Sequence, residues 1–189
     1  MSLLQEIQND VTNSNVSISN LLRKCKILAY KLGNEDFKAW VEYELNGYPK
    51  DQQFLPNYRI LKNVYSKGHF SGSFGRALRD ADVPTFNLPK ELQEILTTAN
   101  FFSPVATLEN LTTTTASTLS QEWGATILAQ FGNNMYEGYV CMQAWKVIPT
   151  SFVIGIVDTI KTKILNFVLE IEMIDKDAGD VAINSIIIS

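Results

Sequence analysis

The chain has 189 residues, of which 46% are hydrophobic and 19% are charged, and its formal net charge is -4. A chain of this length and composition can bury a core large enough for one domain without disulfides or a bound metal. The net negative charge argues against nucleic acid as a partner, because Lys and Arg that neutralise phosphates supply most of the sequence-independent affinity for nucleic acids.

Residues 1–47 predict three helices. Apolar residues at helical spacing indicate a short helix around Ile7 and a second helix that begins near Ser17 or Ser19 and ends at Gly33. A third helix is predicted over residues 34–45. Its buried side chains are expected to be Phe37, Trp40, Val41 and Leu45.

The next part of the chain has a β character. A twisted, half-exposed strand is expected from Tyr58 onward, and a second extended piece is expected around Val83 to Phe86. Glycines between the two pieces indicate a turn or a bulge, and they are Gly68, Gly72 and Gly75. We expect Phe70 and Phe74 to pack inward from this glycine-rich turn.

Shorter elements follow. Helices are predicted over residues 90–96, after Pro104 to residue 111, and over residues 123–131. The threonine-rich residues 112–118 predict an exposed loop within the domain. Residues 136–147 favour a strand by composition, with an apolar helical run as the alternative.

The longest predicted element is an amphipathic helix over residues 151–172, which starts after Pro149. One side of it carries Phe152, Ile156, Ile160, Ile164, Phe167, Val168 and Ile171. Val153, Ile154 and Val157 widen the apolar surface of its first half, which we expect to be enclosed by other elements. Together the elements predict an α+β fold that is predominantly helical, with N-terminal helices, a small twisted antiparallel sheet and a long buried C-terminal helix.

Two parts are predicted along the chain, a single globular domain over residues 1–174 and an acidic spacer with a β-prone tail over residues 175–189. The tail contains an uncharged, β-branched run of the kind that pairs with an exposed strand edge. Its candidate self-association residues are Ile183, Ile186, Ile187 and Ile188. The alternative is a truncated or disordered terminus.

Few residues suggest chemistry. Cys25 and Cys141 form no C-x-x-C pair and His69 is the only histidine, so we expect two buried free thiols, no metal site and no cofactor. Ser71 and Ser73 lie near His69, but no acidic residue is placed to orient the histidine for catalysis. We therefore expect His69 to be structural or solvated.

The glycine-rich stretch also offers a candidate anion site. Successive backbone N–H groups, with an arginine beside them, can bind a phosphate. The candidate residues are Gly68, Gly72, Gly75 and Arg76. The stretch lacks the lysine and the spacing of a Walker motif, and a glycine-rich turn between strands is the favoured alternative.

Several motifs together resemble one protein family. They lie at residues 21–25, 32–35, 39–42, 44–48 (ELNGY), 58–59, 70–75, 88–92 (LPKEL), 144–145, 155–160 and 169–172. With them the chain is similar to the AbiTii domain family, bacterial proteins assigned to abortive phage infection. Family members often have proline at the position of Ser73 and arginine at those of Lys161 and Lys163. The resemblance implies antiviral defence and supplies no catalytic residues.

We therefore expect an interaction or oligomerisation module of a bacterial antiphage defence system, more consistent with a binding role than with an enzyme. Its partner would be another protein or a further copy of the chain, in a homo-oligomer. The alternative is a toxin or effector enzyme, such as a nuclease, with an active site assembled from distant residues. The N-terminus carries no secretion signal and no apolar run is long enough to cross a membrane, which predicts a cytoplasmic protein without membrane contact.

Overall fold

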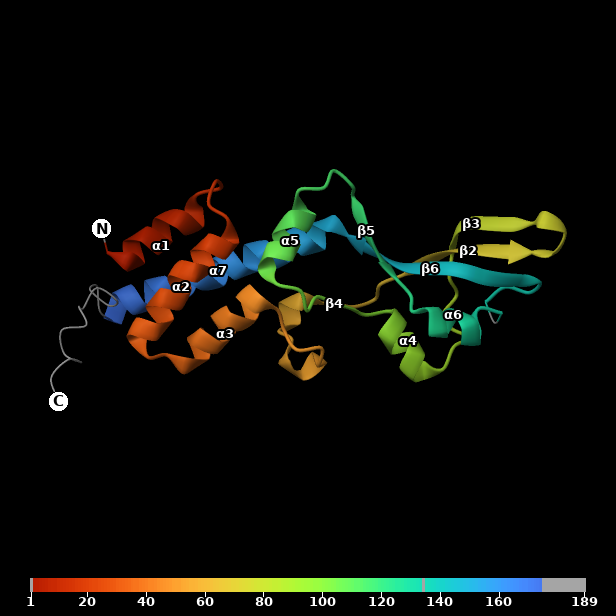
Figure 1. Ribbon diagram of the computed structural model, residues 1–189, viewed down its shortest axis with the longest axis horizontal. Helices are drawn as coiled ribbons and strands as arrows, with labels where there is room; N and C mark the ends of the chain where they lie inside the picture. Colours follow the sequence, from red (N-terminus) through yellow and green to blue (C-terminus); the bar gives the residue numbers. More distant parts are fainter. Residues whose placement is uncertain (1, 134, 175–189) are drawn as a thin grey trace. The chain divides into compact units, whose positions relative to one another are not determined.

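The computed structural model describes residues 2–133 and 135–174, and Figure 1 shows its helices and strands. These residues form two compact units, which are described separately. The helical unit comprises residues 2–54, 102–114 and 153–174, and the sheet unit comprises the remaining described residues from 55 to 152. The single globular domain over residues 1–174 stays a prediction.

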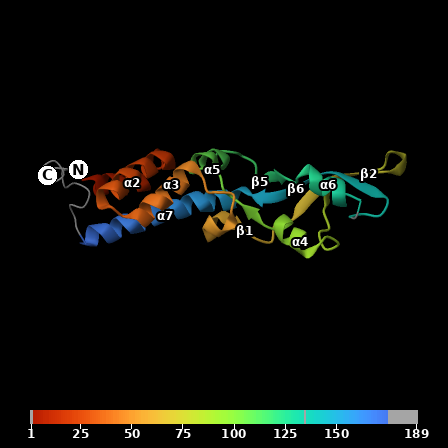
Figure 2. The same cartoon turned by 60° about the horizontal axis from the view of Figure 1, so that its bottom comes forward.

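Five helices make up most of the helical unit. They are α1 (Leu3–Thr12), α2 (Ile18–Leu32), α3 (Glu35–Asn46), α5 (Val105–Thr112) and α7 (Thr150–Ile174), which enters this unit at Val153. Both views show α7 running beside α2 and α3 (Figure 1, Figure 2). A short 3-10 helix over Gln52–Phe54 follows α3.

Side chains and glycine set the ends of the first three helices. The hydroxyl of Ser17 accepts the backbone N–H of Asn20 at the start of α2, and the side chain of Asn34 accepts that of Phe37 at the start of α3. Gly33 ends α2 in the left-handed conformation, with φ 63°, which glycine adopts without steric cost. The predicted N-terminal helices and their boundaries are confirmed.

The long helix α7 buries one stripe of apolar side chains. The buried residues recur every three or four positions and are Val153, Ile156, Ile160, Ile164 and Val168. Ile154 is 49% exposed, so the prediction that the first half of α7 is enclosed on nearly all sides is wrong. In α3, Trp40 and Leu45 are only partly buried, which also corrects the expected core.

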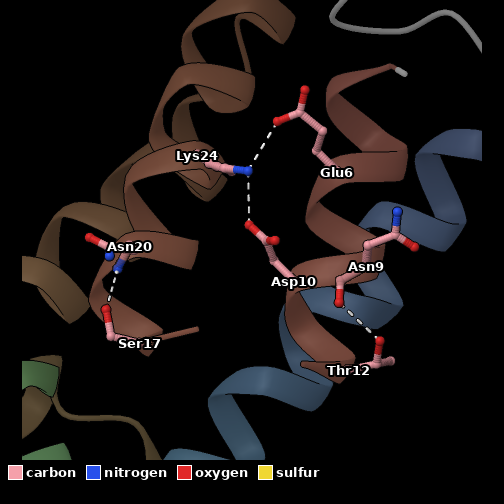
Figure 3. A network of polar contacts seen from close by, with 7 residues as sticks. All are labelled: Glu6, Asn9, Asp10, Thr12, Ser17, Asn20 and Lys24. Atoms are coloured by element: carbon pink, nitrogen blue, oxygen red, sulfur yellow. Dashed lines mark hydrogen bonds and ion pairs between the residues drawn. The ribbon is translucent and has the colours of Figure 1, made fainter. Parts of the chain in front are cut away.

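A lysine bridge joins the first two helices, as Figure 3 shows. The ammonium of Lys24 on α2 lies 2.9 Å from a carboxylate oxygen of Asp10 and 3.0 Å from one of Glu6, both on α1. Hydrogen bonds to Asp10 and then to Glu6 raise the pKa of Lys24. Because the bridge is near the surface, we expect solvent to screen most of its Coulomb energy.

The sheet unit is built on four antiparallel strands in the order β3-β2-β6-β5. The strands are β2 (Ser66–Gly72), β3 (Ala77–Asp82), β5 (Thr118–Glu122) and β6 (Tyr139–Pro149). A second, two-stranded sheet pairs β1 (Ile60–Leu61) with β4 (Ala99–Asn100). The connecting elements include the short 3-10 helices Asn57–Arg59 and Ser73–Gly75, and the helices α4 (Lys90–Leu96) and α6 (Ala125–Phe131).

The core of the sheet unit lies between the four-stranded sheet and these two helices. Its buried residues include Phe70, Leu88, Leu96, Trp123, Cys141 and Ala144, and residues of α4 and α6 pack against them. Lys146 on β6 fastens α4, because its ammonium donates to the carbonyls of Ile95 at 2.8 Å and Thr98 at 2.6 Å. Burial lowers the pKa of this lysine.

Some predicted boundaries in the sheet unit were wrong. The chain from Tyr58 forms a 3-10 turn and a two-residue strand before β2 begins at Ser66, and the second extended piece, β3, ends at Asp82 rather than covering residues 83–86. The helix over residues 90–96 and the strand in residues 136–147 are confirmed. The predicted α+β, predominantly helical fold class is therefore confirmed as a whole.

Candidate functional site

The turn between β2 and β3 holds the most exposed aromatic side chain in the described chain. Phe74 is fully exposed there, so the prediction that it packs inward is wrong. Its backbone is left-handed, with φ 58° and ψ 33°, and Gly75 after it is left-handed too, with φ 74°. Figure 1 shows this turn at the end of the β2–β3 hairpin.

Phe74 carries two costs in folding free energy. A left-handed conformation costs a residue with a side chain about 1–2 kcal/mol relative to glycine. An exposed phenylalanine also forgoes about 1.5–3 kcal/mol that its burial would contribute. Glycine or asparagine at this position would avoid both costs. Folding therefore does not explain a phenylalanine here, and strained residues gather at binding and catalytic sites.

Hydrogen bonds close the turn around Phe74. The N–H of Gly72 donates to the carbonyl of Arg76 at 2.8 Å, and the N–H of Arg76 donates to the carbonyl of Ser73 at 3.3 Å. The guanidinium of Arg76 lies over the ring of Tyr139, 5.6 Å from its centroid. These contacts fix the backbone on both sides of the exposed ring. We call residues 72–76 the hairpin tip.

The four candidate anion-binding residues are only partly brought together. Gly72, Gly75 and Arg76 lie in the hairpin tip, whereas Gly68 lies inside β2 against β6. A Cβ atom at Gly68 would lie 2.7 Å from the carbonyl oxygen of Gln143, so the close approach of β6 explains this glycine. Since the N–H groups of Gly72 and Arg76 bond within the turn, anion binding stays a prediction without further support.

His69 supports the hairpin. The pairing of β2 with β3 shifts between Gly68 and Phe70, and Asp80 on β3 takes a positive φ of 50° at this irregularity. The Nδ1 atom of His69 accepts the N–H of Asp80 at 3.2 Å, and its ring meets Trp145 edge-on at 4.9 Å. The histidine therefore satisfies a backbone donor at a β-bulge.

A groove in the helical unit is the second candidate site. It lies between α3 and α7, has a volume of about 340 Å³, and is lined by Phe37, Trp40, Lys163, Asn166, Phe167 and Glu170. The rings of Phe37 and Phe167 stack with centroids 3.6 Å apart, and Phe37 also stacks on Trp40 at 5.8 Å. Three aromatic rings from two helices thus form one wall, which we call the aromatic groove.

Acidic residues lie at and near the aromatic groove. Glu170 on α7 lines it and is exposed. Asp36, also exposed, lies one helical turn before Trp40 on α3 and therefore on the same side of that helix. Sequence analysis missed the groove, because it forms only where α3 meets a helix more than 100 residues later. Its local signal was two aromatic residues three positions apart on one helix, Phe37 and Trp40.

Both cysteines are free and buried, as predicted. Burial raises the pKa of the Cys25 thiol to about 12 and also raises that of Cys141. Within the described residues, no three His, Cys, Asp or Glu side chains gather closely enough to hold a metal ion. The candidate self-association residues Ile183, Ile186, Ile187 and Ile188 lie outside the described residues.

The fold and its two candidate surfaces define an α+β protein with an exposed hairpin tip and an aromatic groove. The model of the AbiTii family matches residues 2–185, and the chain therefore belongs to this family of bacterial abortive infection defence. Among curated proteins and among solved structures, no match to the chain was found. Across residues 2–133 and 135–174, no helix is both long and apolar enough to cross a membrane.

Proposed function

We propose that this chain is an interaction module of a bacterial antiphage defence system and that it docks on a protein partner through Phe74. The observation that supports the proposal most is the combination of full exposure and left-handed backbone at this residue. Both features disfavour a phenylalanine in the free protein. Burial of the ring in a complex would recover its hydrophobic contribution, which offsets the cost of the left-handed backbone.

The hairpin tip has the properties of a binding anchor. Binding energy at protein interfaces concentrates in a few side chains, among which aromatic residues and arginine are frequent, that fill pockets on the partner. Phe74 and Arg76 supply one of each within three residues. The hydrogen bonds of the turn hold this short segment in place before binding, which lowers the conformational entropy lost on association.

Substitution of Phe74 by alanine tests the proposal. In bacteria that carry the complete defence system, we expect Phe74→Ala to abolish protection in a phage plating assay while the purified variant melts like the wild type. Phe86→Ala is the matched control, because Phe86 is 73% exposed in the same unit and has an ordinary backbone conformation. Full protection by Phe74→Ala would contradict the proposed function.

A further inference from the structure

We infer that the partner of the hairpin tip is a second copy of this chain, whose aromatic groove receives Phe74. This inference rests on the proposed function, because it names the partner of the same residue. The two surfaces lie in different units of the chain and each lacks something that the other provides. The tip presents an aromatic ring without a pocket, and the groove presents a pocket walled by aromatic rings.

The size and the lining of the groove suit a single aromatic side chain. Its volume of about 340 Å³ is near the lower end of the range for pockets that enclose small ligands. The stacked rings of Phe37 and Phe167 offer faces and edges against which a further ring can pack in an offset or edge-on arrangement. Phe74 lies two residues beyond the last pair of β2 with β6, Gly72 with Tyr139, and is fully exposed, so its ring is accessible to an open groove.

The charges around the two surfaces are complementary. Arg76 is the only charged residue in positions 71–77, so the hairpin tip is locally positive. The groove lining holds one carboxylate, Glu170, and one ammonium, Lys163, and Asp36 adds a second carboxylate one turn before Trp40, so carboxylates outnumber the ammonium by one. When Phe74 enters the groove, the guanidinium of Arg76, two residues later, can leave the ring of Tyr139 and pair with these carboxylates.

This contact joins two different surfaces, so it is heterologous. Each copy then offers one tip and one groove, and the assembly closes into a ring or grows as a chain. A heterologous contact has a signature that a two-fold dimer lacks. A copy that lacks the tip keeps its groove, and a copy that lacks the groove keeps its tip. A mixture of the two variants can therefore form one contact, between the intact tip and the intact groove.

Light scattering on full-length variants tests this signature. Phe74→Ala removes the anchor and Asn166→Trp fills the groove from an exposed position on α7, and we expect each to weaken self-association at least about tenfold. Mixing the two variants should restore a complex, a 1:1 heterodimer that does not grow further. Asp158→Trp, at an exposed α7 position two helical turns before Asn166 and outside the groove lining, is the matched control and should assemble like the wild type.

Several results would overturn the inference. One is a wild-type chain that stays monomeric at all concentrations, another is an Asn166→Trp variant with wild-type mass, and a third is a mixture without the heterodimer. If deletion of residues 181–189 alone abolishes assembly, the tail is the contact instead. Loss of phage protection in Phe74→Ala, with full protection in Asn166→Trp, would retain the proposed function and assign the tip to a different protein.

Discussion

Two phenylalanines four residues apart in one hairpin have opposite environments. Phe70 in β2 is 2% exposed and meets Tyr136 edge-on at 4.9 Å, whereas Phe74 in the tip is fully exposed. The first has an extended backbone in the ladder between β3 and β6, and the second is left-handed. Residue type alone therefore does not set the role of an aromatic side chain. Phe70 stabilises the fold, whereas the proposed role of Phe74 is contact with a partner.

The same contrast within α7 should give the largest energetic effect. Ile160 is completely buried and Ile154 is 49% exposed on the same helix. We expect Ile160→Asp to lower the free energy of unfolding by at least about 4 kcal/mol, because an unpaired charge enters the core. Ile154→Asp should lower it by about 1 kcal/mol or less. Chemical denaturation of both variants checks this, and equal effects would remove the contrast.

The hairpin pair should show the next largest effect. We expect Phe70→Ala to cost about 3–5 kcal/mol of stability, because it leaves a cavity between the sheet and its helices. Phe74→Ala should change stability by no more than about 0.5 kcal/mol. Urea titrations followed by tryptophan fluorescence measure both values. A large loss for Phe74→Ala would mean that its ring packs within the fold.

Local signals predicted the helices well. Ser17, Gly33 and Asn34 fix helix ends through hydrogen bonds and backbone conformations that involve only nearby residues. The helix over residues 90–96 likewise follows from Pro89 and its own apolar spacing. Such elements could be predicted because the interactions that begin and end them are close in the sequence.

The sheet unit and both candidate surfaces depend on partners that are distant in the sequence. Gly68 and Phe70 belong to β2 because β6, about 70 residues later, pairs with them. That pairing shortens the predicted glycine-rich turn to the residues around Phe74. The aromatic groove needs Phe37 to meet Phe167, a contact that no local pattern encodes. Sequence therefore indicated the right residues at these places without showing which were exposed.

Lys146 makes a partly buried polar contact in the sheet unit, and its removal should have a smaller effect. We expect Lys146→Met to lower stability by about 2 kcal/mol, because the carbonyls of Ile95 and Thr98 lose a charged donor. Lys62→Met is the control at an exposed position of the same unit. Thermal melting of the two variants measures the difference. If they melt alike, Lys146 does not fasten α4 to the sheet.

Replacement of Phe74 by glycine should stabilise the protein, whereas most substitutions destabilise a protein. Phe74→Gly removes the left-handed penalty, and we expect a gain in stability of about 1 kcal/mol. A gain together with lost phage protection would therefore separate stability from function at one residue. Differential scanning calorimetry checks the gain. A lower melting temperature would show that the ring of Phe74 supports the turn.

The smallest expected effect concerns the partly exposed ion pair between Lys26 on α2 and Glu42 on α3. The hydrogen bond from Lys26 lowers the pKa of Glu42. A carboxylate with a lowered pKa contributes stability above its unfolded pKa and loses it as pH falls through the folded one. Glu42→Gln should therefore lower the melting temperature slightly at pH 7 and leave it unchanged at pH 2. A pH-independent difference would contradict this assignment.

Photocrosslinking from position 74, in bacteria that carry the complete defence system, tests directly whether Phe74 is a binding anchor. Phe74 is replaced by benzoylphenylalanine, which preserves an aromatic ring and forms a covalent bond with C–H groups that it contacts. We predict an adduct between position 74 and peptides of α3 or α7 from a second copy, and none when the same probe replaces Phe86. The absence of any protein adduct at position 74 would contradict the claim that this exposed ring is a binding anchor.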